Sequence, residues 1–177
     1  MQKKKRTTLW LCVCATFMAF NVIMCSFYIP VPGGQLYLCD AVICSAAILL
    51  DPFSAFLVGG LGAFLGDLLF YPEAMLASLI THGLQALAVS IFTNCICKKK
   101  PRLGSLIGVV AGAFIMVTGY TVWRRIVLGS WAASLPVAPF EALQATIGGV
   151  LAMLLVWKCG LYQLYERVRS KLSRSEH

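Results

Sequence analysis

Seven side chains that could bind a small molecule lie within long apolar stretches of this sequence. They are His82, Gln85, Tyr120, Trp123, Arg124, Glu141 and Gln144. Histidine, glutamine and glutamate hydrogen-bond to ring heteroatoms, arginine pairs with carbonyl or anionic groups, and the aromatic residues stack on planar rings. A few polar groups in apolar surroundings are typical of a ligand pocket, so we predict these seven as substrate-binding residues.

Two further acids, Asp40 and Asp67, lie in apolar segments and are expected to be structural. Ionisable groups within a membrane are costly and usually face the protein interior, where polar neighbours compensate them. Structural roles are also possible for some of the seven predicted binding residues. His82 could be a hydrogen-bonded core histidine, Tyr120 and Trp123 could belong to an interfacial aromatic belt, and Arg124 could reach lipid headgroups.

Six apolar segments must position these side chains. The chain has 177 residues, of which 59% are hydrophobic and 12% charged, whereas soluble domains are about half apolar and a quarter charged. We predict membrane-spanning helices at about residues 8–28, 36–50, 52–70, 73–97, 103–128 and 139–161, followed by an amphipathic tail over 162–177. The expected fold class is an all-α, polytopic six-helix bundle that forms one domain over residues 1–177.

The basic residues predict the orientation of this bundle. All but two of the 15 lysines and arginines fall at positions 3–6, 98–102 and 158–174, which six crossings place on one side of the membrane. Short basic loops stay in the cytoplasm, so both termini are expected there, in a bacterial cell membrane. Contacts with lipid headgroups account for the net charge of +8, and nucleic acid binding is not needed.

This orientation gathers the predicted binding residues in the outer third of the bundle. Tyr120, Trp123 and Arg124 share one helix face because they are spaced at i, i+3 and i+4. His82 and Gln85 are one turn apart on another helix, as are Glu141 and Gln144. The Pro-Gly segment at 30–34 and the connection at 129–139 are placed to act as lids over such a pocket.

The remaining motifs argue against catalysis or a resident cofactor. The eight cysteines are scattered through apolar runs, where a free thiol acts as a small hydrophobe, so we expect no metal site. The sequence contains no phosphate-binding GxxxxGK[ST] loop, no HExxH and no GxSxG. We therefore predict no cofactor and no enzyme activity, and any ATP hydrolysis would have to come from other subunits.

Four stretches carry a resemblance to a known family. They are PVPGGQLYLCDAVICSAAILLDPFSAFLVGGLGAFLGDLL, GLQALAVSIF, GYTVWRRIVLG and PFEALQATIGGVLA. In order and spacing they resemble the substrate-binding S-components of energy-coupling factor (ECF) vitamin transporters. The chain departs from the family pattern at Cys39, Asp51, Thr81-His82 and Trp123-Arg124, and the last two of these departures affect the predicted pocket.

The resemblance implies a receptor that works within a larger importer. An S-component binds a vitamin or precursor from outside, docks on a membrane coupling subunit driven by two ATPase subunits, topples and releases its substrate inside. Ala15 and Ala19 match the family's AxxxA docking motif. The predicted lining favours a pyridoxine- or hydroxymethylpyrimidine-like heteroaromatic, while a queuosine precursor and pantothenate stay open.

Three other classes of protein are possible from the residues alone. A stand-alone secondary transporter would take up substrate without ATPases, although such proteins usually show internal repeats. A non-catalytic membrane scaffold would tolerate changes in the outer polar cluster without losing a bound small molecule. An intramembrane enzyme using His82 with Asp67 or Glu141 would show turnover by the purified chain.

Overall fold

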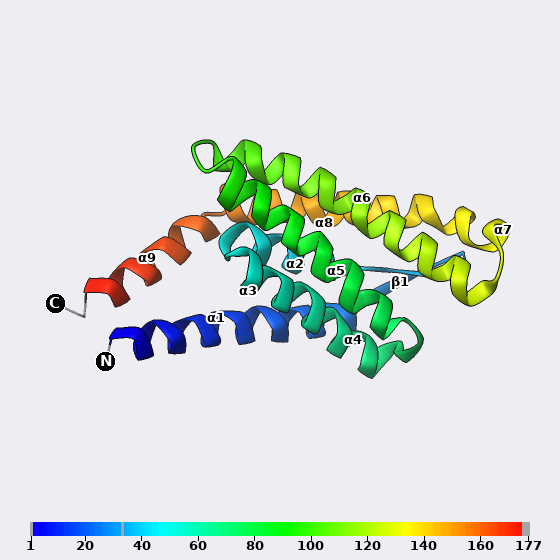
Figure 1. Ribbon diagram of the computed structural model, residues 1–177, viewed down its shortest axis with the longest axis horizontal. Helices are drawn as coiled ribbons and strands as arrows, with labels where there is room; N and C mark the ends of the chain where they lie inside the picture. The colour runs from blue at the N-terminus through cyan, green and yellow to red at the C-terminus, as the bar shows by residue number, and fades with distance from the viewer. Residues whose placement is uncertain (1, 33, 175–177) are drawn as a thin grey trace.

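The protein is a bundle of helices with a small β-hairpin, shown in Figure 1 as a computed structural model that describes residues 2–32 and 34–174. The α-helices are α1 (Gln2–Cys25), α2 (Cys39–Leu49), α3 (Pro52–Phe56), α4 (Gly62–Phe70), α5 (Met75–Ser90), α6 (Pro101–Leu128), α7 (Trp131–Ser134), α8 (Ala138–Trp157) and α9 (Leu161–Arg174). The shorter turns are the π-helices η1 (Leu57–Leu61) and η3 (Ile91–Ile96) and the 3₁₀ helices η2 (Pro72–Ala74) and η4 (Leu135–Val137).

Several of these pieces join into longer helical segments. Four segments are long and apolar enough to cross a membrane, namely Pro52–Phe70, Pro72–Ile96, Pro101–Leu128 and Trp131–Trp157. Two shorter apolar helices, Trp10–Cys25 and Cys39–Leu49, complete the set. The all-α class is therefore confirmed, while the count of six crossings and the cytoplasmic termini stay predictions.

A β-hairpin occupies the segment before α2. We predicted that the second helix would begin at about residue 36. Strands β1 (Tyr28–Val31) and β2 (Gly34–Tyr37) pair antiparallel, with Tyr28 opposite Tyr37. Pro30 and Pro32 cannot donate backbone hydrogen bonds within a helix, so the chain turns back instead. Helix α2 consequently begins only at Cys39.

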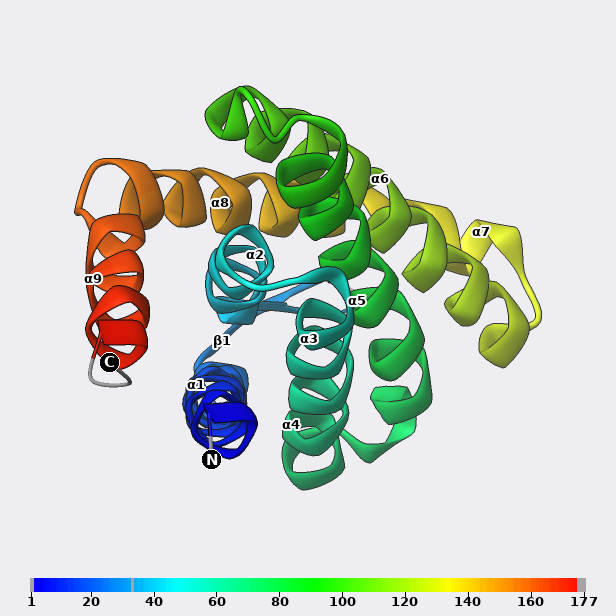
Figure 2. The same cartoon turned by 60° about the vertical axis from the view of Figure 1, so that its left-hand side comes forward.

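Helix α2 lies in the middle of the bundle, between α1, α3, α5 and α8 (Figure 2). Its 11 residues extend only about 16 Å, roughly half of a bilayer core. The end of such a helix must satisfy its free carbonyls inside the protein. The side chains of Ser90 and Asn94 do so by donating to the Leu50 carbonyl, over 2.6 and 2.9 Å.

The next helix begins where the sequence predicts. Asp51 is the N-cap of α3 and its carboxylate accepts from the backbone N–H of Ser54 at 3.1 Å, while Pro52 takes the first helical position. Burial raises the pKa of the Asp51 carboxyl, but hydrogen bonds from the Ser54 side chain and backbone outweigh that effect, so its pKa is lowered overall.

Small residues let α1 approach α4 closely. A methyl group added to Gly62 would lie 2.5 Å from Nδ2 of Asn21, and one added to Gly66 would lie 2.6 Å from Sγ of Cys25. Asn21 is fully buried, and its Nδ2 donates to the Val58 carbonyl in the π-helical turn η1 at 3.2 Å. The Val58 carbonyl also accepts from the backbone N–H of Gly62, so the Asn21 bond is an additional contact that ties α1 to this turn.

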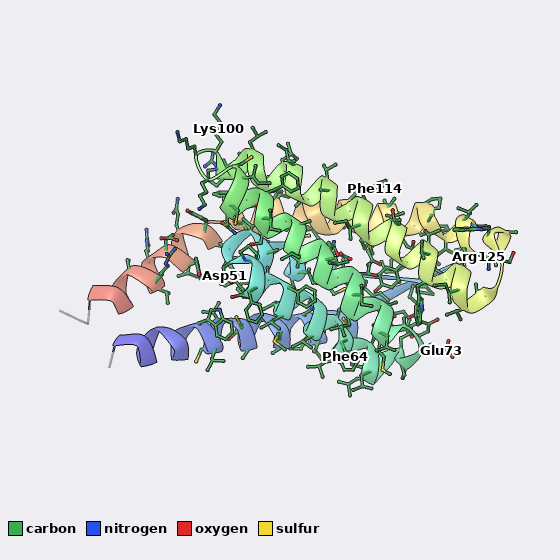
Figure 3. The ribbon with its side chains drawn as sticks, in the orientation of Figure 1. Asp51, Phe64, Glu73, Lys100, Phe114 and Arg125 are labelled. Atoms are coloured by element: carbon green, nitrogen blue, oxygen red, sulfur yellow. The ribbon has the colours of Figure 1, made fainter. Side chains whose placement is uncertain are left out.

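The two ends of the bundle differ in character. The first turn of α1, the labelled Lys100 loop and the last turn of α9 lie toward one end, and Glu73 and Arg125 are labelled toward the other (Figures 1 and 3). We call the second end the cavity end. The basic segments predicted to be cytoplasmic are thus separated from Glu73 and Arg125 along the long axis of the molecule.

Candidate functional site

A cavity of about 390 Å³ opens at the cavity end of the bundle. Its walls come from the hairpin, α4, η2, α6, the α7–η4 connection and α8. The predicted residues among its lining are Asp67, Tyr120, Trp123, Arg124, Glu141 and Gln144. Side chains from positions 67 to 144 therefore meet in one space, whose volume lies toward the lower end of the range for small-molecule sites.

An ion pair joins two helices at the wall of the cavity. Nη1 of Arg124 on α6 donates to Oε1 of Glu141 on α8 at 2.6 Å. Side chains are exposed by only 20% for Arg124 and 9% for Glu141, so the pair is largely shielded from solvent. The hydroxyl of Thr121 lies 3.5 Å from the second oxygen of Glu141, which is a weak contact.

A second set of polar contacts joins α4, α5 and α6 next to the cavity. The hydroxyl of Ser78 donates to the carboxylate of Asp67 and lies 2.5 Å from the hydroxyl of Tyr120. Ser78 is fully buried and Asp67 is 7% exposed. Tyr120 is therefore held by its hydroxyl while its ring remains part of the cavity wall, an arrangement suited to stacking against a planar ligand.

A buried network centred on Asp40 supports the cavity. Asp40 has no exposed surface; its Oδ1 accepts from Nε2 of Gln85 at 2.7 Å and its Oδ2 accepts from Nε2 of Gln144 at 2.6 Å. Gln144 in turn accepts the backbone N–H of Tyr37 at 2.9 Å. Asp40 thus orients a cavity residue and, through it, ties the hairpin to α8.

His82 and Gln85 lie in this network rather than in the cavity lining. Nδ1 of His82 is 2.7 Å from Oε1 of Gln85, and both residues are buried. The His82 ring packs edge-on against Tyr120, with ring centroids 5.5 Å apart. Direct contact of these two residues with substrate stays a prediction, and the geometry favours a supporting role through Tyr120 and Gln144.

The sequence did not single out several lining residues. Gln35, Tyr37 and Tyr71 are among them, the first two from β2. The hydroxyl of Tyr37 donates to the Gln35 side chain, and burial raises the pKa of that hydroxyl, which keeps it protonated. Gln35 and Tyr37 are spaced at i and i+2 on β2, so their side chains lie on the same face of the strand. We did not predict this short strand, which follows directly on the Pro-Gly turn.

One group of side chains has the composition of a metal site. Ligand atoms of Cys39, Asp40 and His82 all lie within 4.8 Å of one another. Each Asp40 oxygen already accepts an amide hydrogen, and Nδ1 of His82 faces the Gln85 amide. Since hydrogen bonds occupy the Asp40 oxygens and Nδ1 of His82, these two residues are explained as parts of the buried network.

Together these features define a membrane-embedded receptor for a small molecule. The cavity offers aromatic faces from Tyr120 and Trp123, together with fixed donors and acceptors from Arg124, Glu141 and Gln144. An apolar lining with a few placed polar groups is typical of small-molecule sites.

Comparisons with known proteins identify the family. Residues 5–160 match the model of the family described as "ECF-type riboflavin transporter, S component". A Pyrococcus woesei protein described as "Uncharacterized protein in gap 3'region" is 33% identical over 141 residues, which cover 75% of this chain and 90% of that protein. The solved structure of the S component of a bacterial ECF transporter shares the fold, with a TM-score of 0.67, 14% identity, and coverage of 89% of this chain and 98% of that one.

The chain belongs to the family of ECF-type riboflavin transporter S components. It is accordingly a multi-pass membrane protein and a substrate-binding subunit of an ECF importer, rather than an enzyme.

Proposed function

We propose that this chain captures a small heteroaromatic vitamin or vitamin precursor in the cavity and delivers it to an ECF importer. The observation that carries the proposal is the cavity of about 390 Å³, where an aromatic wall meets a shielded ion pair and an oriented amide. A pyridoxine- or hydroxymethylpyrimidine-like ring is the favoured substrate. Riboflavin enters as a third candidate because the matched family carries that name.

The proposed roles follow from the positions of the side chains. Trp123 and Tyr120 stack on the ring, while Arg124, Glu141 and Gln144 present hydrogen-bonding groups to its edge. His82 and Gln85 act from beneath by fixing the Tyr120 ring and the Asp40 network.

The hairpin and the α7–η4 connection are the candidate lids. Both contribute residues to the cavity wall, among them Val31 and Gln35 from the hairpin and Ala133 and Val137 from the connection. Their closure over a bound ring would exclude water and strengthen its polar contacts.

Docking on a coupling subunit is assigned to α1. Ala15 and Ala19 are exposed, one turn apart, on a face that also exposes Leu11 and Ile23. Small side chains in such a row let another membrane helix approach closely. We propose that this face meets the coupling subunit and that two ATPase subunits supply the energy.

The orientation in the membrane is part of the same proposal. Six crossings, with both termini in the cytoplasm of a bacterium, place the cavity end outside. Lys98, Lys99 and Lys100, which follow η3, then lie at the inner surface. Accessibility labelling of single cysteines placed at Glu73 and at Lys99, each in a background without other reactive thiols, would test it.

Binding by the purified chain is the decisive experiment. Riboflavin, pyridoxine, hydroxymethylpyrimidine, a queuosine precursor and pantothenate would be titrated against the protein in detergent, with native mass spectrometry of any co-purified ligand. Trp123→Ala and Arg124→Ala should each weaken the tightest interaction by about 1.5–3 kcal/mol. Phe114→Ala on the exposed face of α6 and Arg167→Ala on α9 are matched controls that should leave affinity unchanged.

Two results would overturn the assignment. If the Trp123 and Arg124 variants both bind with parental affinity, these residues do not belong to the site. If the chain alone accumulates substrate in vesicles without ATPases, the protein is a stand-alone secondary transporter.

A further inference from the structure

The charged groups that line the cavity are mostly acidic. Asp67, Glu73 and Glu141 contribute carboxylates, and Arg124 is the only base among the lining residues that the structure describes. Three carboxylates and one guanidinium give a formal charge of −2. A proton held by any one of the carboxyls still leaves the lining negative.

The single base is not free to receive an anion. Arg124 is held by Glu141 at 2.6 Å, so its charge is already neutralised at the wall. Its neighbour Arg125 is directed elsewhere, with its guanidinium carbon 5.6 Å from the centre of the Trp131 ring. Trp131 also lies outside the cavity lining, so Arg125 offers no second cation to a bound group.

The layer beneath the cavity adds to the negative character. Asp40 is fully buried behind Gln144, and its two oxygens are held by neutral amide donors, those of Gln85 and Gln144. His82 is the titratable base of that layer, and its Nδ1 lies 3.7 Å from Asp40, so any positive charge on it would be paired. An anionic ligand would therefore meet repulsion from the wall and from below in surroundings that screen charge poorly.

The carboxylate of Glu141 is instead suited to accept from a ligand. One oxygen is bound to Arg124, while the other has only the 3.5 Å contact with Thr121. Arg124 uses one of its five N–H groups in the pair, which leaves others for a carbonyl or ring nitrogen. Side by side, the two groups match a ring edge that has an N–H or amino donor beside an acceptor.

We infer that the cavity selects uncharged or cationic nitrogen heterocycles with a donor on the ring edge, and that it excludes their carboxylated and phosphorylated forms. This inference rests on the function proposed above. It removes pantothenate, a carboxylate, from the open candidates, and it makes Glu141 a specificity-determining residue.

The test compares ligands that differ chiefly in charge. Riboflavin, pyridoxine and hydroxymethylpyrimidine each have a hydroxymethyl group, so each can be paired with its carboxylate and phosphate derivatives. The decisive comparison uses the parent compound that binds the purified chain best. Its carboxylate and phosphate derivatives should each bind about 10- to 100-fold more weakly. This loss of affinity corresponds to the free energy of one hydrogen bond to a charged group.

Glu141→Gln supplies a second readout. The change removes one negative charge from the lining and releases Arg124. Affinity for the best neutral ligand should therefore fall about 10- to 100-fold, while the difference in affinity between that ligand and its carboxylate derivative narrows. Glu166→Gln on α9 is the matched control, since Glu166 is in an exposed pair with Arg169 at 3.1 Å. That variant should leave both affinities unchanged.

The outcomes separate the inference from the function on which it rests. A carboxylated or phosphorylated derivative that binds as tightly as its parent overturns the charge selection and leaves the receptor function standing. If the difference in affinity between the neutral ligand and its carboxylate derivative is the same in Glu141→Gln as in the parental chain, Glu141 is not the cause of the charge selection. If no heterocycle of the panel binds, the proposed substrate class is overturned and the charge selection with it.

Discussion

Replacing Asp40 should distinguish a structural acid from one that merely lies near the substrate. Asp40 is fully buried, and each of its oxygens accepts a hydrogen bond from a buried amide, that of Gln85 on one side and that of Gln144 on the other. Asp40→Ala would leave the Gln144 amide without this acceptor and the Gln85 amide with only its 3.8 Å contact to Sγ of Cys44. At about 1–3 kcal/mol for each buried unpaired group, the expected cost is about 2–6 kcal/mol.

Asp40→Asn should cost much less because the network can rearrange around it. If the Gln85 amide flips, its oxygen accepts from the new Asn side chain and its nitrogen faces Nδ1 of His82, which is an acceptor in one tautomer. On the other side the Tyr37 N–H fixes the orientation of Gln144, so the remaining oxygen of the new side chain must keep that contact. Loss of charge assistance alone should cost about 1–2 kcal/mol.

Thermal unfolding of the detergent-solubilised chain would measure the difference. For a protein of this size 1 kcal/mol corresponds to about 2–4 °C, so Asp40→Ala should lower Tm by about 4–24 °C and Asp40→Asn by about 2–8 °C. Ser170→Ala, on the exposed side of α9, is a control for handling. An unchanged Tm for Asp40→Ala would refute the network as a source of stability, and equal losses for both variants would refute the proposed rearrangement.

Three further changes test the packing and the docking face. Gly62→Val should lower stability by about 1–3 kcal/mol, measured as a loss of Tm, because its side chain would overlap Asn21 and separate α1 from α4; parental Tm would show that α1 adapts freely. Ala15→Leu with Ala19→Leu should preserve ligand affinity but abolish ATP-dependent uptake and co-purification with the coupling subunit; normal uptake by a well-expressed double variant contradicts the docking assignment. Asp51→Ala should cost about 1 kcal/mol through loss of a helix cap, with ligand affinity unchanged.

Some features of the protein follow from local sequence. The apolar segments and the prolines between them predicted separate helices, and the N-cap at Asp51 lies where the sequence predicts it, although α1 begins at Gln2 rather than at residue 8. Transfer of a segment into lipid depends mainly on its own composition, so a stretch of sequence carries this information by itself. Five of the seven predicted binding residues, Tyr120, Trp123, Arg124, Glu141 and Gln144, line one cavity, and their contact with substrate stays a prediction.

Which polar residues face the cavity was decided only by the tertiary structure. His82 and Gln85 have the residue types of a binding site, yet the rotation of α5 points them into the Asp40 network. That rotation is set by close contacts between helices, such as Gly59 against Ala86, where an added methyl group would lie 2.7 Å away. The hairpin, too, adds Gln35 and Tyr37 to the wall, because a turn between two strands brings them back over α8. Hydropathy fixes the depth of a residue in the membrane, whereas its direction depends on packing between segments far apart in the chain.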